Sequence, residues 1–286
     1  MTENLRPQSL PRRTFADLRV NRPMGALARA VSKKRGLVFV HVPKCGGTSV
    51  ERALRGHYRL GRRLIGPEET YEAARTLLGR GDEEADRHVV LQRASELRRD
   101  LLHLHLAEGA TLVTGHAPLG ATTLAAFAAT HDFITVMRGP AERMRSHVAY
   151  NKNQAAGHGR SELTVTRFLE TDRAQVLGAL YVKYFAGLPM TADLTSQAAI
   201  DAAKRTVDRL ALVGFTDAMP LFADKLHALT GLRVRIGHQN KGRETNLPGG
   251  AAERIEALCA PDNAVYAHAR ARFGERRARD RQGQAR

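Results

Sequence analysis

Short, nearly continuous apolar runs alternate along the chain with longer stretches that mix apolar and polar residues. Runs of this kind are typical of strands buried on both faces, as in a parallel sheet. The sequence predicts four such strands, at residues 36–42, 111–114, 133–137 and 210–215. The stretches between and after them predict helices, at residues 48–54, 68–108, 121–129, 140–150, 161–209, 217–229, 251–258 and 261–273.

This alternation predicts an α/β protein in which a parallel sheet is flanked by helices in three layers, with right-handed crossovers. In such sheets the loops at the carboxyl ends of the strands meet at one edge, where ligands bind. The chemically distinctive loops of this chain follow predicted strands. We therefore expect these loops to converge at that edge.

The composition favours a single folded domain with charged ends. The chain has 286 residues, 43% of them apolar, and its 45 Lys and Arg exceed its 29 Asp and Glu by 16. Much of the excess lies at the ends, since residues 1–36 hold nine basic and two acidic residues, and residues 270–286 hold seven and two. We expect a basic, partly disordered lead-in at 1–35, a domain at 36–274 and a basic tail at 275–286.

The composition also predicts the location of the protein and the kind of partner that it attracts. No apolar run approaches 18 residues and the N-terminal segment has no apolar core, so neither a transmembrane helix nor a secretory signal is expected. Two cysteines, Cys45 and Cys259, are too few for a disulfide framework, which favours the cytoplasm. The net charge attracts anions, whether nucleic acid, anionic lipid, acidic polysaccharide or a phosphorylated nucleotide.

A glycine-rich turn follows the first predicted strand and has the composition of a phosphate-binding loop. Glycines let the backbone approach an oxyanion closely, and the amides at the start of a helix point toward it. Lys44 adds a positive charge, and Thr48 and Ser49 add hydroxyl donors. A plain strand-to-helix turn capped by Thr48 is the alternative. The turn reads Pro43-Lys44-Cys45-Gly46-Gly47-Thr48-Ser49, with the lysine before the glycines and not after them as in the ATP-type loop.

A second candidate anion site follows the strand at 133–137. Arg138 leaves the end of that strand, and Ser146 lies about two helical turns further on. A guanidinium and a hydroxyl in these positions can hold one phosphate from two sides. The alternative is a basic, solvated helix.

Together these two segments resemble the PAPS-dependent sulfotransferases, which use 3′-phosphoadenosine 5′-phosphosulfate (PAPS) as sulfonate donor. The form HVPKCGGTS at 41–49 is similar to the branch that includes the carbohydrate 2-O-sulfotransferases and their bacterial relatives. The segment from Arg138 to His147 resembles the family pattern R-x-P-x-x-R-x-x-S-H, with Gly139 where Asp or Asn is usual. Further similarities lie at residues 112–120, 212–216, 240–246 and 262–266.

The resemblance implies a P-loop-like sulfotransferase fold and a role for each segment. The turn from Lys44 to Ser49 would hold the 5′-phosphosulfate, and Arg138 with Ser146 would hold the 3′-phosphate. The polar loop at 240–246, with Lys241 and Arg243, would close over the 3′-phosphate and the adenine. Cys45 would belong to the loop as a small residue that fits, which we favour over a reactive thiolate.

The implied reaction needs charge stabilisation on the leaving phosphate and a base for the attacking hydroxyl. We assign the first role to Lys44. For the base we favour His116, because it leaves a strand at the expected edge and matches the family's catalytic histidine; a structural histidine is the alternative. Of the other histidines, we expect His41 to pack in the core, and His147 to support the second phosphate site. His158 is a candidate acceptor contact.

The acceptor would be a hydroxyl of a carbohydrate or of another small metabolite, and an acidic glycan is compatible with the charge. We expect no metal, since His103 and His105 lie two residues apart on different helical faces. We expect no sequence-specific nucleic-acid partner. The competing functions are a nucleotide kinase of related fold and a non-catalytic, basic protein that binds nucleic acid or anionic membrane.

Overall fold

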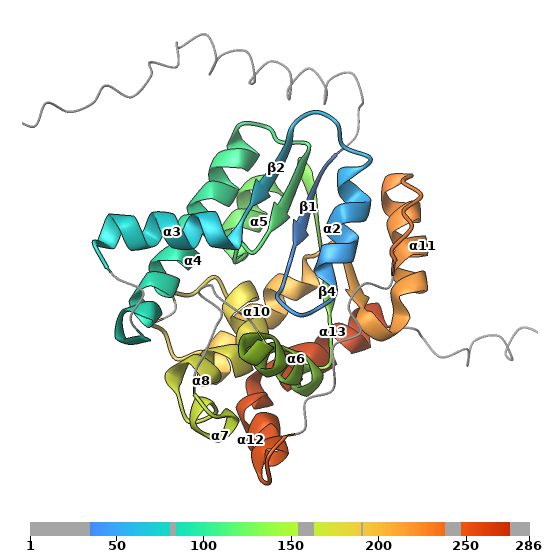
Figure 1. Ribbon diagram of the computed structural model, residues 1–286. Helices are drawn as coiled ribbons and strands as arrows, with labels where there is room; N and C mark the ends of the chain where they lie inside the picture. Colours follow the sequence, from blue (N-terminus) through green and yellow to red (C-terminus); the bar gives the residue numbers. More distant parts are fainter. Residues whose placement is uncertain (1–34, 81–83, 154–162, 190, 238–246, 275–286) are drawn as a thin grey trace, which may run out of the picture.

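A computed structural model describes residues 35–80, 84–153, 163–189, 191–237 and 247–274. Five parallel strands form one sheet with the order β2-β3-β1-β4-β5 (Figure 1). In chain order they are β1 (Gly36–Val40), β2 (Arg62–Ile65), β3 (Leu112–Gly115), β4 (His131–Met137) and β5 (Leu212–Phe215). The predicted α/β class with a parallel sheet is therefore confirmed.

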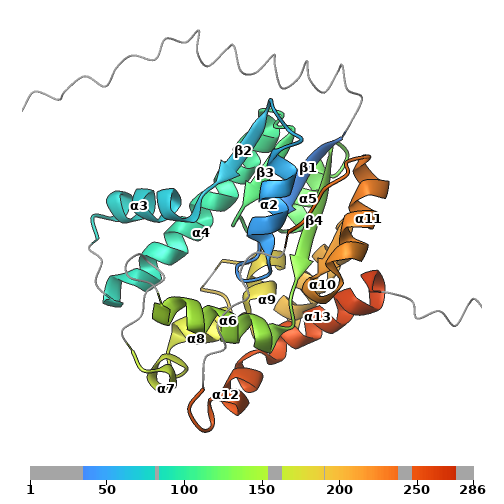
Figure 2. The ribbon, with the colours of Figure 1, turned by 45° about the vertical axis from the view of Figure 1, so that its right-hand side comes forward.

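The sheet is covered on both faces because its strands carry apolar side chains on both faces. Along β1, Leu37 and Phe39 belong to one core cluster and Val38 and Val40 to another. Helices α2 (Gly47–Arg55) and α11 (Met219–Thr230) cover the first face, as Figure 2 shows. The other face is covered by α4 (Glu84–Ala107), α5 (Ala121–Phe127) and α10 (Gln197–Asp208).

The remaining helices gather beyond the carboxyl edge of the sheet and extend the second core. Helix α6 (Pro140–Asn153) follows β4 directly, and α12 (Ala251–Leu258) packs against α6 and α8 (Asp172–Gly178). Helix α13 packs against α9 and α10. These helices lie next to the loops that follow the strand ends (Figure 2). They are α7 (Val165–Phe168), α8 (Asp172–Gly178), α9 (Leu180–Phe185), α12 (Ala251–Leu258) and α13 (Ala260–Phe273).

The structure corrects the sequence prediction in three places. Strand β2 was not predicted, because it lies at the sheet edge and three of its four residues are exposed or only partly buried, so no apolar run marks it. The helical stretch 68–108 is two helices, α3 (Pro67–Leu78) and α4. The stretch 161–209 is likewise not one helical region, since α7, α8, α9 and α10 are separate and residues 191–196 are not helical.

The predicted lead-in at 1–35, except for Arg35, and the predicted tail at 275–286 lie outside the described residues, so the proposed boundaries stay predictions. Within the described ranges, no helix has the length and apolar character needed to cross a membrane.

Candidate functional site

The strand order places the predicted site residues side by side along the carboxyl edge. The three central strands run β3, β1, β4, and all are parallel. His116 directly follows β3, Lys44 lies in the turn after β1, and Arg138 directly follows β4. Three segments that are far apart in the sequence therefore meet at one edge, as the sequence predicts.

The turn after β1 has two residues in the left-handed region of the backbone. Lys44 has φ 65° and Gly46 has φ 71°, and Lys44 is the only non-glycine among the described residues with a positive φ. Such a conformation is strained for lysine and is common at functional sites. Gly46 is the N-cap of α2 and supplies no side-chain hydrogen bond to the first turn. Thr48 is therefore not the cap of this helix, and no side chain of the N-cap residue bonds the first-turn amides; a plain strand-to-helix turn stays the alternative to an anion-binding loop.

Gly47 is required by a close approach of His41. A Cβ atom at Gly47 would lie 2.1 Å from Cδ2 of the His41 ring, far inside contact distance. That ring cannot move away easily, because its Nδ1 lies 3.3 Å from Oε2 of Glu51 and it packs against Phe39 and His116. His41 is a buried residue, as predicted, and it also shapes the loop.

Lys44 points across the edge toward α6. Its Nζ lies 3.7 Å from the ring centroid of Tyr150, which is one helical turn beyond Ser146. Residues four apart share a helix face, so Ser146 lies on the face that Lys44 approaches. Burial lowers the pKa of Lys44, and the neighbouring Arg138 guanidinium lowers it further. The two predicted anion-binding cations are thus close enough to repel each other, and a bound polyanion would relieve that repulsion.

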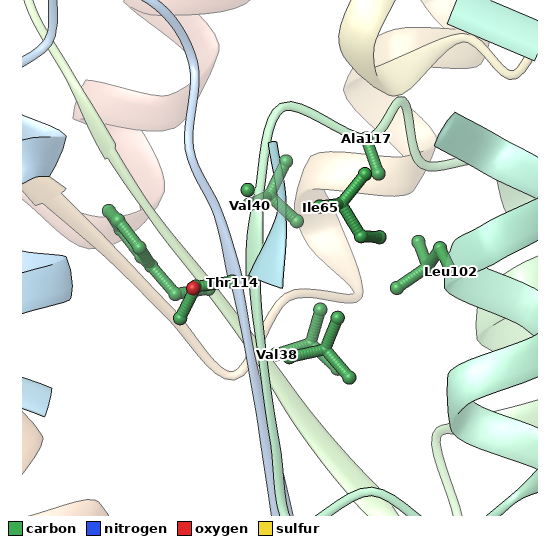
Figure 3. A pocket seen from close by; sticks show the side chains of 9 residues that line it. Val38, Val40, Ile65, Leu102, Thr114 and Ala117 are labelled. Carbon is green, nitrogen blue, oxygen red and sulfur yellow. The ribbon is translucent and has the colours of Figure 1, made fainter. Parts of the chain in front are cut away.

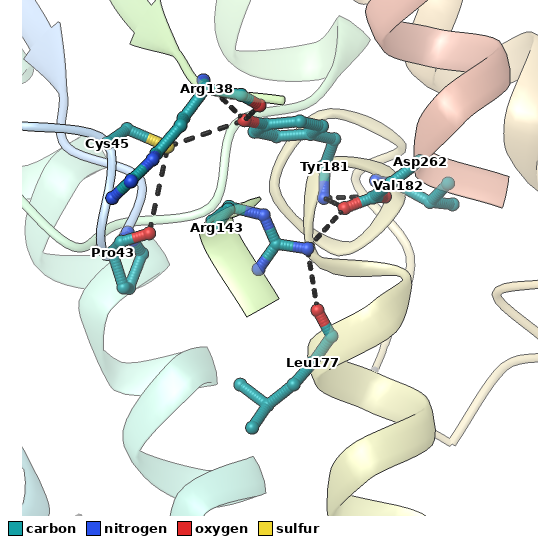
Figure 4. A network of polar contacts seen from close by, with 8 residues as sticks. All are labelled: Pro43, Cys45, Arg138, Arg143, Leu177, Tyr181, Val182 and Asp262. Carbon is teal, nitrogen blue, oxygen red and sulfur yellow. Dashed lines mark hydrogen bonds and ion pairs between the residues drawn. The ribbon is translucent and has the colours of Figure 1, made fainter. Parts of the chain in front are cut away.

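The hydroxyl of Tyr181 on α9 joins the two candidate loops (Figure 4). It donates to the backbone carbonyl of Arg138 at 2.5 Å and accepts from the Arg138 amide at 2.8 Å. The same oxygen lies 3.4 Å from Sγ of Cys45. One buried side chain thereby fixes the spacing between the turn after β1 and the end of β4.

Cys45 is a buried structural residue. Its side chain is 1% exposed and points to Tyr181 and to the carbonyl of Pro43. Burial raises the pKa of the thiol, so the reactive-thiolate alternative is not supported. Any contact of Cys45 with a ligand would go through its backbone amide. Cys259 is also buried.

Arg138 is available at the rim of the site. Its side chain is about one-third exposed, and Nε donates to Oε2 of Glu142 at 3.3 Å. An exposed pair of this kind contributes little to stability, so an incoming phosphate can replace Glu142 as its partner. Ser146 is partly buried on α6, at roughly 9 Å along the helix axis from Pro140.

Arg143 and Asp262 form a buried ion pair next to Tyr181, and the sequence did not predict this pair. Both side chains are 0% exposed, and Nη2 of Arg143 lies 2.9 Å from Oδ2 of Asp262 (Figure 4). Asp262 also accepts the backbone amides of Tyr181 and Val182. Burial raises the pKa of Asp262, whereas the neighbouring Arg143 guanidinium and the backbone amides that the carboxylate accepts lower it. The pair fixes the position of Tyr181.

His116 has a defined tautomer. Its Nδ1 lies 2.7 Å from the backbone carbonyl of His41, which can only accept, so Nδ1 carries the proton. In the neutral ring Nε2 is then the basic nitrogen. The ring packs 4.3 Å from that of His41, centroid to centroid, and the carbonyl of His116 accepts the hydroxyl of Tyr184. These contacts hold the His116 ring at the end of β3.

Other predicted contacts lie apart from this cluster or outside the described ranges. The predicted site residues Lys241, Arg243 and His158 lie outside the described residues. His103 bonds Thr123, and His105 lies near Glu108. In the part of the chain that the structure describes, no group of three or more metal-binding side chains is present.

A narrow gap between the sheet and α4 lies near the site but is not part of it. Figure 3 shows Val38, Ile65 and Leu102 converging on it. Its lining is mainly apolar and leaves no room for a water molecule, so we interpret it as imperfect packing of the core.

The arrangement thus combines strand-end amides, two cations and an imidazole, which suits the binding of a polyanion beside a histidine. In comparisons with known proteins, no family model and no curated protein matches the chain.

Proposed function

We propose that this protein is a PAPS-dependent sulfotransferase of P-loop-like fold, which transfers a sulfonate group to a hydroxyl of a carbohydrate or other small metabolite. The observation that carries the proposal is the Tyr181 hydroxyl, which bonds both the turn of Lys44 and the end of β4 at Arg138. Two candidate oxyanion sites that are joined by one side chain suit one nucleotide with phosphates at the 3′ and 5′ positions of its ribose.

The reaction assigns each group one task. The acceptor oxygen attacks sulfur, and the bond between sulfur and the bridging oxygen of the 5′-phosphate breaks. The amides at the start of α2 and the Lys44 ammonium would stabilise the charge that develops on the departing phosphate. Nε2 of His116 would take the proton of the acceptor hydroxyl. The products are the sulfate ester and 3′-phosphoadenosine 5′-phosphate (PAP).

The proposal requires that the second site recognise the 3′-phosphate. Calorimetry should give micromolar binding of PAP and at least tenfold weaker binding of 5′-AMP, which lacks that phosphate. Arg138→Ala should remove the preference, because a charge-assisted bond to phosphate is lost. Arg145→Ala on the same helix is the matched control, since Arg145 is exposed and pairs with Glu256.

Equal affinity for PAP and 5′-AMP in the unmodified protein would overturn the proposal. Binding of ATP with magnesium but not of PAP would favour the kinase. Retention of an anion-binding activity in Lys44→Ala, together with its loss when the basic ends are removed, would favour a non-catalytic binder of nucleic acid or membrane.

Gly47→Ala should weaken PAP binding at least tenfold, because its Cβ would collide with the buried His41 ring and displace the loop. Gly56→Ala is the control at the other end of α2, where a Cβ would meet only the carbonyl of Ala53 at 3.7 Å. Calorimetry with PAP measures both. Unchanged affinity in Gly47→Ala would show that the loop does not hold the nucleotide.

A further inference from the structure

A cluster of arginines lies between the end of α2 and strand β2, outside the candidate site. Residues 52–63 hold five arginines and no acidic residue. Two of the five are partly buried and have acidic neighbours, since Arg55 pairs with Glu51 and Nε of Arg63 lies 3.8 Å from Oε2 of Glu108. The three exposed members are Arg52, Arg59 and Arg62. Within the described ranges, no acidic side chain pairs with Arg59 or Arg62, so positive charge is left uncompensated there.

The backbone of this segment is fixed against strand β3. The carbonyl of Leu60 accepts Oγ1 of Thr111 at 2.6 Å, and the carbonyl of Gly61 accepts the Thr111 amide at 2.8 Å. Nη1 of Arg62 donates to the carbonyl of Arg55 at 3.2 Å, which joins the start of β2 to the end of α2. The exposed side chains are therefore carried by a defined surface and not by a free chain end.

Two leucines are exposed among these arginines. Leu60 is 55% exposed and Leu64 is 48% exposed. Leu64 lies two residues after Arg62 in the edge strand, so their side chains lie on the same face of the sheet. Cationic and apolar side chains together are typical of protein surfaces that bind at the boundary between lipid headgroups and acyl chains.

This surface lies at the end of α2 that is opposite to the candidate phosphate turn. The helix has nine residues, so its two ends are about 13 Å apart. The loop before β2 lies at the amino edge of the sheet, away from α6 and α12 (Figures 1 and 2). A partner that covers this surface therefore leaves the loops at the carboxyl edge accessible.

The chain that precedes the described residues enters at the same edge. Arg35 lies directly before β1, and the amide of Leu37 donates at 3.0 Å to the carbonyl of Thr111, the residue that also bonds the loop before β2. Residues 1–34 hold eight basic and two acidic residues. The sequence thus brings further positive charge to the edge at which the arginine cluster lies.

We infer that Arg52, Arg59, Leu60, Arg62 and Leu64 form a surface that docks on a membrane with anionic lipid headgroups. The arginines bind the headgroups, and the two leucines enter the apolar boundary beneath them. Nucleic acid also attracts arginines, but its phosphate backbone offers no apolar layer to the leucines, so the leucines favour lipid. The inference goes beyond the proposed function and does not depend on it, because neither a nucleotide nor an acceptor takes part.

Sedimentation of the full chain with vesicles tests the role of the arginines. Vesicles of phosphatidylserine and phosphatidylcholine in equal parts should bind the protein, vesicles of phosphatidylcholine alone should not, and added salt should release it. The double variant Arg59→Gln, Arg62→Gln should bind about 30-fold more weakly, because each basic residue near an anionic surface contributes about 1 kcal/mol. Arg59→Lys, Arg62→Lys keeps both charges and should bind as the unmodified protein does.

The control for charge is Arg80→Gln, Arg167→Gln. It removes the same net charge from exposed arginines elsewhere, after α3 and on α7, and should weaken vesicle binding less than about threefold. Urea unfolding of every variant checks that the fold is kept. No binding to the phosphatidylserine vesicles, or an equal loss in the control and in Arg59→Gln, Arg62→Gln, would overturn the inference.

The leucines separate lipid from nucleic acid. Leu60→Ser, Leu64→Ser should weaken vesicle binding at least about tenfold and leave any binding of double-stranded DNA unchanged. If this variant binds vesicles as well as the unmodified protein does, the leucines do not enter a membrane and the inference is wrong. Because PAP is absent from these experiments, their outcome is distinct from failure of the proposed function, which calorimetry with PAP measures.

Discussion

Replacement of His116 by alanine should slow the release of PAP from PAPS in the presence of a hydroxyl acceptor by about 10²–10⁴-fold, the usual contribution of a general base. Its Nδ1 is committed to the carbonyl of His41, so the ring presents Nε2 as the basic nitrogen. The affinity for PAP should not change, because we assign nucleotide binding to the turn of Lys44 and to Arg138. Single-turnover assays with PAPS measure the rate, and calorimetry measures the affinity.

His103→Ala is the matched control for this variant. His103 lies on α4 and bonds Thr123, so it should leave the rate unchanged. A rate for His116→Ala equal to that of the unmodified protein would remove His116 as the base. A loss of PAP affinity in step with the rate would instead assign it a structural role in the loop, through its contact with His41.

Asp262→Ala should lower the free energy of unfolding by about 3–5 kcal/mol, the usual effect of removing one partner of a buried ion pair. The change leaves Arg143 charged and 0% exposed without its counter-ion, and it leaves the amides of Tyr181 and Val182 without their acceptor. Two other nitrogens of Arg143 already lack a partner among the described residues, so we expect no other group there to replace Asp262 as its counter-ion. Urea unfolding measures the effect.

The double variant Arg143→Met, Asp262→Leu separates the effect of the two charges on stability from the effect of side-chain volume. It removes both charges while keeping apolar volume, so it should recover a large part of the stability lost in Asp262→Ala. Glu256→Ala is the surface control, because its pair with Arg145 is exposed and should contribute less than about 1 kcal/mol. A loss in Asp262→Ala no larger than in Glu256→Ala would show that the buried pair does not stabilise the fold.

Four of the five strands could be predicted because each is a buried run of apolar residues. In β1, for example, all five residues are buried, so no polar position interrupts the pattern. Strand β2 could not be predicted, because as an edge strand it exposes Leu64 and buries only Ile65. Its other two residues are arginines, which are more typical of a loop than of a buried strand. The helix breaks between 161 and 209 depend on tertiary packing, which overrides weak local preferences.

Lys44, His116 and Arg138 could be predicted as neighbours because each lies at a strand end, and parallel strands bring their carboxyl ends to one edge. The contacts of Tyr181 could not be predicted from the sequence. Its partners Cys45 and Arg138 lie 136 and 43 residues away, and its local segment reads as ordinary helical core. The same holds for Arg143 and Asp262, which are 119 residues apart.

By itself, the sequence determined the class of the fold and the chemistry available at the strand ends, because both follow from patterns only a few residues long. The tertiary structure alone decided the order of those ends along the edge, the buried ion pair and the hydroxyl that joins the two loops. The physical reason is that such contacts are made between segments distant in the chain, and their strength comes from burial, which no local pattern encodes.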